Sequence, residues 1–387
     1  MREVFAAALR LGLTSFGGPI AHLGYFRRDY VERRRWLDEA SFADLVALCQ
    51  SLPGPASSQL GIAIGTRRAG PLGGIAAWLG FTLPSAIILV LFARLTGSLD
   101  LSGVGWVHGL KIAAVAVVFQ AVLAMARTLT PDWSRRAIAA IAAAVALTWA
   151  SPYADVAIIV SGAVVGLVLL AAPAVREEVA DPSPVSRRVG IGALATFLIL
   201  LVGLPLVRIA GPAGPLALFD TFYRAGALVF GGGHVVLPLL HGTVVDPGWV
   251  GNDRFLTGYG AAQAVPGPLF TFAAYLGADA TISPNWWAGA AIALVAIFLP
   301  SFLLIFGTLP FWDLLRRSSR WRRALVGTNA AVVGILLAAL YSPIWTSAIG
   351  GPLDVAVALA AVALLVLGRA PPIVVVVLAA LAGLAGA

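Results

Sequence analysis

Two polar stretches with the same pattern contain the side chains in this sequence that are best suited to binding an anion. They supply the neutral hydrogen-bond donors Gln50, Ser57, Ser58 and Gln59 in the first stretch and Gln263 and Thr271 in the second. Amides and hydroxyls suit an oxyanion whose charge is balanced elsewhere. The hydroxyls of Ser57 and Ser58 have an alternative role, because serine also caps the first turn of a helix.

Each polar stretch is built around a Pro-Gly-Pro sequence, Pro53-Gly54-Pro55 in the first and Pro266-Gly267-Pro268 in the second. Proline lacks a backbone N–H and glycine loosens the backbone, so neither stretch can continue as a helix. Apolar residues surround both breaks, which indicates that they lie at membrane depth. A broken helix is tolerated there only if protein or a water-filled cavity satisfies the freed backbone groups. A pair of such breaks in matching halves is typical of a transporter's binding site.

Two runs of glycine offer backbone groups for the same purpose. They are Gly17-Gly18 and Gly231-Gly232-Gly233, and the second run leads to His234. Glycines leave backbone N–H groups accessible to a ligand, and the helix that follows presents its positive N-terminal end. The alternative is close packing between helices, where small residues let two backbones touch.

Three cations lie within or beside apolar segments. Arg10 and Arg224 occupy equivalent positions in two short apolar helices, where a guanidinium costs about 2.5 kcal/mol or more. Either these side chains reach the membrane interface, or they form a charge clamp for an anion, one from each half. Lys111, near the start of another apolar run, is either an interfacial residue or a cation of the transport site.

Hydrolytic, redox and metal chemistry find no support in the sequence. The four histidines lack the spacing of metal ligands, and no carboxylates cluster in the apolar segments. Asp44 is an isolated acid that we expect near the membrane interface. The single cysteine, Cys49, excludes an intramolecular disulfide or a cysteine metal cluster. We therefore expect no enzyme activity, no cofactor and no bound metal.

The composition identifies the environment of these groups. Of 387 residues, 60% are apolar and 11% are charged, whereas soluble proteins carry about 25% charged residues. The mean hydropathy is +0.93. The sequence therefore predicts an all-α integral membrane protein. Its net charge of +8 comes mainly from arginine-rich cytoplasmic loops, which explain it without nucleic acid.

The chain is an internal duplication. Phe5, Arg10, Gly12 and Phe16 recur 214 residues later, and Trp36, Phe42, Gln50 and the first Pro-Gly-Pro recur 213 residues later, in unchanged order. Leu83-Pro84-Ser85 returns as Leu299-Pro300-Ser301. We divide the chain into an N-terminal transporter repeat (1–172), a cytoplasmic linker with a connecting transmembrane helix (173–214) and a C-terminal repeat (215–387).

Arginine counts indicate that the two repeats are inverted relative to each other. Residues 27–35 include five arginines, whereas the matching loop 241–254 has only Arg254. Conversely, residues 95–106 include no basic residue, and 309–323 include five arginines. Basic loops stay on the cytoplasmic side, so equivalent loops should face opposite sides of the membrane.

The resulting topology combines broken or re-entrant helical hairpins at membrane depth with full spans. The first apolar helix provides only about 20 Å at 1.5 Å per residue, too short for about 30 Å of hydrocarbon. We predict re-entrant hairpins at 4–26, 40–66, 217–240 and 255–277. We predict spans at 71–94, 106–126, 137–150, 154–172, 189–208, 285–308, 324–341, 353–367 and 371–386. The alternative is that some hairpins cross completely.

The motifs together resemble the chromate ion transporter (CHR) family over nearly the whole chain. The resemblance rests on Trp36 and on residues 16–22, 50–56, 81–85, 230–238 and 263–268. It implies a two-domain, multi-pass carrier of chromate in the inner cell membrane, of a kind usually associated with efflux and chromate resistance. The resemblance also implies sulfate as a close mimic of chromate. Together with the two breaks, it predicts alternating access around an anion site formed by the broken helices of both repeats.

Two other functions remain open from the sequence. A passive anion channel could not move the anion against a gradient, and a membrane-embedded enzyme acting on a lipid-linked substrate would need a catalytic constellation. The coupling ion, the direction of flux and the oligomeric state are left open, with a homodimer as one option. Gly54→Ala or Gly267→Ala should greatly reduce transport with a modest loss of stability. Gly162→Ala, in what reads as an ordinary span, should do little.

Overall fold

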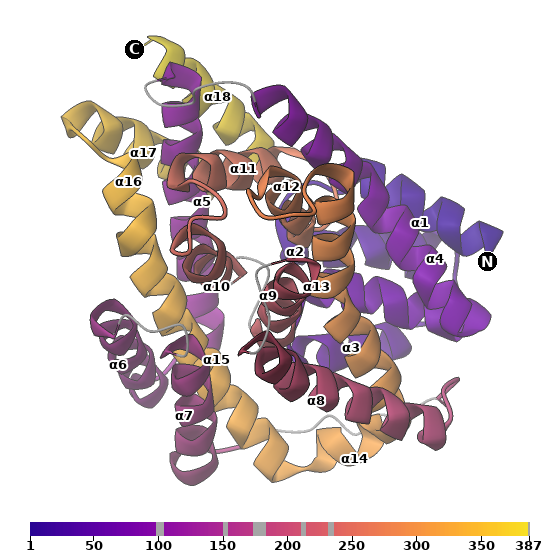
Figure 1. The fold of residues 1–387 in the computed structure, drawn as a ribbon. Coiled ribbons are helices and arrows are strands. Elements are labelled where there is room, and N and C mark those ends of the chain that lie inside the picture. The colour runs from indigo at the N-terminus through magenta and orange to yellow at the C-terminus, as the bar shows by residue number, and fades with distance from the viewer. Residues whose placement is uncertain (98–103, 150–153, 173–182, 210–213, 231–235, 386–387) are drawn as a thin grey trace. The chain divides into compact units, whose positions relative to one another are not determined.

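The computed structural model describes residues 1–97, 104–149, 154–172, 183–209, 214–230 and 236–385, which form helices and no strands (Figure 1). Five of the described helices are long and apolar enough to cross a membrane, and four shorter ones are also apolar. The predicted class, an all-α integral membrane protein, is confirmed.

The helices follow one another as the apolar segments predict. In the described part of the first half they are α1 (Arg2–Thr14), α2 (Gly18–Phe26), α3 (Glu39–Gln50), α4 (Ala56–Thr96), α5 (Gly105–Leu129), α6 (Trp133–Thr148) and α7 (Ala154–Leu169). The connecting helix is α8 (Arg187–Ile209). Each predicted hairpin or span of this half overlaps one or two of these helices, and α4 extends over both the end of the predicted hairpin 40–66 and the predicted span 71–94.

The described part of the second half is divided into more and shorter elements than the first. Its helices are α9 (Pro215–Leu228), α10 (Val236–Leu240), α11 (Asn252–Ala264), α12 (Phe272–Asp279), α13 (Trp286–Thr308), α14 (Trp312–Arg317), α15 (Ser319–Ala339), α16 (Thr346–Ala348), α17 (Pro352–Val366) and α18 (Pro372–Ala385). Short π-helical turns are η1 (Arg27–Arg33), η3 (His241–Val245) and η6 (Leu340–Trp345), and short 3₁₀ turns are η4 (Leu269–Thr271) and η5 (Leu309–Phe311). The re-entrant topology and the inversion of the repeats remain predictions.

Local sequence explains where the helices around the two breaks begin and end. α3 starts after Asp38, whose carboxylate accepts a hydrogen bond of 2.7 Å from the Ser41 N–H, and this bond lowers the pKa of Asp38. α3 then ends at Gln50, directly before the first Pro-Gly-Pro, and α4 begins after it. The second Pro-Gly-Pro separates α11 from η4 and α12 in the same way.

α4 is a tight hairpin of two helical limbs rather than one straight helix. Its backbone leaves the helical region at Ala69 and Gly70, where Gly70 adopts a positive φ of 70°. A Cβ atom added to Gly65 would collide with the Gly73 carbonyl oxygen, so the two limbs pack backbone against backbone. Gly277 and Gly289 make the equivalent contact between α12 and α13.

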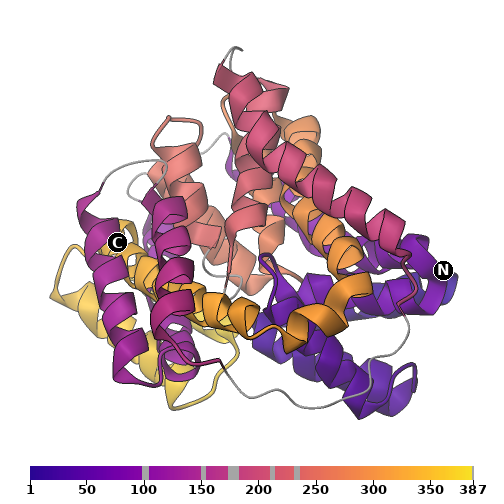
Figure 2. The same ribbon diagram turned by 90° about the horizontal axis from the view of Figure 1, so that it is seen from below.

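The chain forms two compact units, and each unit takes segments from both halves of the sequence. Unit 1 comprises Met1–Leu91, Ala174–Gly233 and Pro266–Ser319, and unit 2 comprises Phe92–Pro173, His234–Val265 and Arg320–Ala387. Within unit 1, α13 packs against α9, α12 and α8, which runs beside it in Figure 2. Within unit 2, α5 packs against α18, α17 and α11 (Figure 1). The division of the sequence at 172 and 215 remains a prediction about the repeats.

Small residues bring the helices of unit 2 into close contact. A Cβ atom on Gly162 of α7 would lie 2.6 Å from the Ala331 Cβ and 2.8 Å from the Gly327 carbonyl oxygen, both on α15. The expectation that Gly162 tolerates alanine is therefore wrong. Its apolar surroundings in the sequence do not reveal that it faces another helix at backbone distance.

Candidate functional site

The two Pro-Gly-Pro breaks share one backbone conformation that requires glycine. Gly54 has φ of 120° and Gly267 has φ of 96°, both in the left-handed region that residues with a Cβ atom rarely adopt. Pro53, Gly54 and Pro55 are buried, as is Pro268, whereas Pro266 and Gly267 are partly exposed. The glycine is thus needed for the turn of the chain as well as for the close approach of its neighbours.

Each break is held by the opposite repeat through one backbone hydrogen bond. The Gly54 N–H donates to the Val229 carbonyl oxygen at 2.6 Å, and the Gly267 N–H donates to the Ser15 carbonyl oxygen at 2.9 Å. Ser15 and Val229 are equivalent residues of the two repeats, 214 positions apart. Each directly follows the first helix of its repeat. All four residues belong to unit 1. The two bonds are therefore one crossed pair.

The serine of each Leu-Pro-Ser sequence lies against the glycine of the opposite break. A Cβ atom on Gly54 would be 2.9 Å from Ser301 Oγ and 2.6 Å from Gln59 Nε2. A Cβ atom on Gly267 would be 2.8 Å from Ser85 Oγ. Ser85 and Ser301 are again equivalent, so a second crossed contact accompanies the first.

The neutral donors predicted around the first break are buried, with one exception. Ser57 Oγ lies 3.3 Å from His22 Nδ1, Gln59 Nε2 donates to the Pro53 carbonyl oxygen at 2.6 Å, and Ser58 Oγ is buried without a hydrogen-bond partner. Neither serine hydroxyl caps α4, so the capping interpretation of these two residues is wrong. Gln50, at the end of α3, is exposed.

The second break differs in its side chains. Thr271 Oγ1 donates to the Pro268 carbonyl oxygen at 2.7 Å, and the same oxygen also accepts a hydrogen bond from the Thr271 N–H at 3.0 Å. Gln263 belongs to unit 2, where it interacts with the Tyr259 hydroxyl. Lys111, also in unit 2, donates to Asp253 Oδ1 at 2.6 Å. Its role as a cation of the transport site remains a prediction.

The first glycine run has the backbone conformation expected of a turn that exposes N–H groups. Gly17 and Gly18 have φ of 98° and 76°, and α2 begins at Gly18. A Cβ atom on Gly18 would meet nothing within 4 Å, so close helix packing does not explain this glycine. The second run, Gly231-Gly232-Gly233 with His234, lies outside the described residues.

The two equivalent arginines each lie beside a buried carboxylate. Arg224 binds both oxygens of the fully buried Asp220 at 2.8 and 2.9 Å, and Arg208 contacts the same carboxylate at 3.2 Å. Arg10 is 56% exposed, and its Nη1 lies 3.9 Å from the buried Asp29. A charge clamp on a substrate anion remains a prediction for both arginines, and the contacts of Arg224 favour a structural role for that residue.

Comparison with known proteins identifies the family. The family model described as Chromate transporter matches residues 2–167 and again residues 216–384. The chain belongs to the chromate transporter family. As a member of this family with several apolar helices of spanning length, it is a multi-pass membrane protein of the cell membrane.

Relatives of this chromate transporter family member come from several bacteria. A probable chromate transport protein of Synechococcus elongatus is 30% identical over 88% of this chain and 84% of its own length. A chromate transport protein of Pseudomonas aeruginosa is 29% identical over 86% of this chain and 79% of its own length. A third, from Cupriavidus metallidurans, is 26% identical over 88% of this chain and 82% of its own. No solved structure matches the chain significantly.

Several buried polar residues of this chromate transporter family member escaped the sequence interpretation. In unit 1, Ser15 Oγ, His22 Nε2, Thr82 Oγ1 and Ser301 Oγ are buried without a hydrogen-bond partner. His22 also packs its ring edge-to-face on Phe81, with 5.3 Å between the ring centres. His22 and Ser301 lie in sequence motifs, and this membership was the signal that could have drawn attention to them. Neither motif, however, indicates which of its residues is left without a hydrogen-bond partner.

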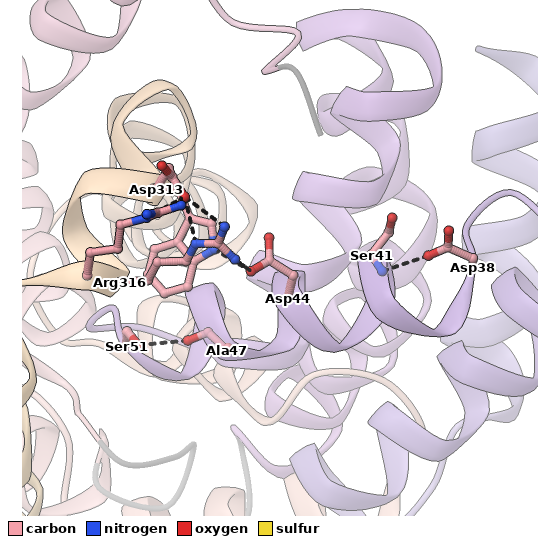
Figure 3. Close-up of polar contacts among 9 residues, drawn as sticks. Asp38, Ser41, Asp44, Ala47, Ser51, Asp313 and Arg316 are labelled. Atoms are coloured by element: carbon pink, nitrogen blue, oxygen red, sulfur yellow. Dashed lines mark hydrogen bonds and ion pairs between the residues drawn. The ribbon is translucent and has the colours of Figure 1, made fainter. Parts of the chain in front are cut away.

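Asp44 has a different environment from the one that the sequence suggests. This carboxylate is buried, and its Oδ1 accepts hydrogen bonds from Trp312 Nε1 at 2.8 Å and from Arg316 Nη1 at 3.2 Å. Figure 3 shows the Arg316 guanidinium between Asp44 and Asp313. The expectation of an isolated acid is wrong, because its partners lie more than 260 residues later in the sequence. The pair ties α3 to α14 within unit 1.

The described residues contain no group of three or more histidine, cysteine or acidic side chains placed to hold a metal ion. The polar side chains around the first break are those of His22, Ser57, Ser58, Gln59 and Ser301, which are hydroxyls, one amide and one imidazole. The hydroxyl O–H and amide N–H groups among them can donate hydrogen bonds to an oxyanion.

Proposed function

We propose that this chain is a carrier that moves chromate through the inner cell membrane, in the direction of efflux, by alternating access around an anion site at the broken helices of the two repeats. Membership of the chromate transporter family and the chromate transport proteins among its relatives support the substrate class. The crossed pair of hydrogen bonds, from Gly54 to Val229 and from Gly267 to Ser15, is the observation that carries the mechanism.

The crossed pair suits a carrier for a geometric reason. Transporters built from repeats bind substrate where the repeats meet, at discontinuous helices whose freed backbone groups can coordinate it. Here each repeat supplies one glycine N–H and one carbonyl to the other, so a relative movement of the repeats would alter both breaks together. The affinity for a ligand at this point would therefore depend on which arrangement the repeats adopt.

Sulfate is expected to compete with chromate. The two anions are tetrahedral dianions of similar size, and hydroxyl and backbone N–H donors distinguish such anions poorly because they read shape and charge rather than the central atom. We therefore propose that sulfate binds the same site as a mimic or a second substrate. The candidates for its contacts are those predicted site residues of the two breaks that belong to unit 1.

Counterflow in proteoliposomes tests the proposal. Vesicles loaded with unlabelled chromate and diluted into radiolabelled chromate should transiently accumulate the label above its equilibrium level, and external sulfate should reduce this accumulation. Label that enters only to equilibrium would indicate a passive channel. Uptake no faster than in protein-free vesicles, with chromate and with sulfate, would refute transport of either anion.

A further inference from the structure

The two breaks are equivalent in backbone but unequal in chemistry. We propose that the anion binds at the first break, through the neutral hydroxyl donors of Ser58 and Ser301, and that the second break is its structural counterpart without a ligand. This assignment rests on the proposed transport function and adds to it the location of the binding contacts and their uncharged nature.

The side chains that follow the two breaks differ position by position. Ser57 and Gln59 correspond to Phe270 and Phe272 in the second repeat, at an offset of 213. Both phenylalanines are buried, with 1% and 0% exposure. A fully apolar side chain offers no hydrogen bond to an oxyanion, so the polar side chains of Ser57 and Gln59 have no equivalent at the second break.

The hydroxyls that the two breaks do share differ in whether they are paired. At the second break, Ser85 Oγ donates to the Thr82 carbonyl oxygen at 3.1 Å and Thr271 Oγ1 donates to the Pro268 carbonyl oxygen at 2.7 Å. Their equivalents at the first break, Ser301 Oγ and Ser58 Oγ, have no partner. Both serines are at least 98% buried, with 0% and 2% exposure.

Unpaired buried hydroxyls are costly unless something uses them. An unsatisfied buried polar group destabilises the folded state, and such groups are few in native proteins. Ser301 Oγ lies beside Gly54 of the first break, and Ser58 follows three residues after Pro55. Two unpaired hydroxyls whose equivalents at the second break are paired are more readily explained by a ligand than by chance. Ser301 Oγ and Gln59 Nε2 both lie within 3 Å of one point beside Gly54, so these polar groups converge on the break itself.

The groups around the first break also indicate how the negative charge of the anion is balanced. Arg10 and Arg224 lie beside the carboxylates Asp29 and Asp220, and neither makes a contact with the first break among those described. The limb of α4 that starts at Ala56, directly after the break, directs the positive end of its helix dipole towards that point. Hydroxyls and the helix end would therefore hold the anion without a cationic side chain.

Binding measurements on purified protein in lipid nanodiscs test this assignment, with radiolabelled sulfate as the probe and chromate as competitor. Ser58→Ala and Ser301→Ala should each weaken the binding of both anions by about tenfold or more, as expected for loss of a hydrogen bond to a charged group. Because neither hydroxyl has a protein partner, the melting temperature of these variants without anion should not fall.

Ser85→Ala is the matched control, since it removes the paired hydroxyl at the equivalent position. It should leave anion affinity unchanged and lower the melting temperature instead. Wild-type affinity in both Ser58→Ala and Ser301→Ala, or an equal loss of affinity in Ser85→Ala, would overturn the assignment while leaving transport intact. If the unmodified protein binds neither anion, the proposed function fails, and the assignment fails with it.

Discussion

At the scale of single residues, charge balance separates two arginines that the sequence treats as equivalent. Arg224 neutralises the fully buried Asp220, whereas Arg10 is more than half exposed and lies 3.9 Å from its nearest carboxylate. Without Arg224, the buried Asp220 carboxylate would keep only the longer contact to Arg208 at 3.2 Å and would be poorly compensated, whereas an exposed pair contributes little to stability. The i,i+4 spacing of Asp220 and Arg224 was a readable signal for this pair.

Arg224→Gln is therefore expected to lower the amount of folded protein and its melting temperature, and Arg10→Gln is not. The double variant Asp220→Asn/Arg224→Gln should recover much of both properties, because it removes the buried charge together with Arg224, and the remaining partner, Arg208, is 34% exposed and can be solvated. Size-exclusion chromatography and thermal unfolding measure the effect. Transport that stays low in the recovered double variant would assign Arg224 to the anion, and equal stability of the two single variants would refute the structural role.

The glycines of the breaks give a second prediction at this scale. Gly54→Ala and Gly267→Ala combine a left-handed backbone with a Cβ atom less than 3 Å from a neighbouring side chain, so each should cost about 1–3 kcal/mol and reduce counterflow strongly. The stability loss is larger than the sequence alone suggests. Gly192→Ala in α8 is the control, since its Cβ would meet nothing within 4 Å. Full chromate and sulfate flux in both break variants would show that the breaks do not contribute to transport.

At the scale of elements, the sequence predicts where helices begin, end and break, but not what they contact. Proline and glycine act on the nearest turn of the chain, so the interruptions near Gly54 and Gly267 were readable. The hydrogen bond from Gly54 to Val229 joins residues far apart in the sequence, and no local pattern encodes it. The expectation for Gly162 is wrong for the same reason, because the sequence around a small residue in an apolar run does not differ between a position that faces lipid and one that faces another helix such as α15.

The buried pair between α3 and α14 provides a prediction for elements. Asp44→Asn and Arg316→Gln should each destabilise the protein, and a double-mutant cycle should give a coupling energy of about 0.5–3 kcal/mol, typical of residues in contact. Thermal or denaturant unfolding measures the cycle. The comparison pair is Asp44 with Arg317, whose side chain is 70% exposed and makes no described contact with Asp44. Similar coupling in the two cycles would mean that the ion pair does not fasten α3 to α14.

At the scale of the whole molecule, the inversion of the repeats is the prediction on which alternating access depends. Arg28 and Asp246 lie in equivalent loops of the two repeats, and both are exposed. Arg34, in the same loop, is bound to Asp29 at 2.7 Å and is less suited to substitution. Exposure of a loop does not reveal its side of the membrane, so the orientation has to be measured.

Single cysteines at these two positions, Arg28→Cys and Asp246→Cys in a Cys49→Ala background, should react with a membrane-impermeant thiol reagent from opposite sides. Cys49 is buried, so alanine removes its thiol at little cost in polarity. Labelling of intact cells, compared with inverted vesicles, distinguishes the sides. Labelling from one side only would refute the inversion and the re-entrant hairpins with it.

The crossed pair of hydrogen bonds also determines what either half of the chain can do alone. A lone first half would bury the Gly54 N–H and the Ser15 carbonyl without their partners, and a lone second half would do the same with Gly267 and Val229. Two polypeptides, cut between residues 172 and 183, should therefore depend on each other for folding and assemble when co-expressed. Co-purification of the fragments, with neither accumulating singly, is the expected result. That result would show that the two repeats can assemble without the covalent link between them.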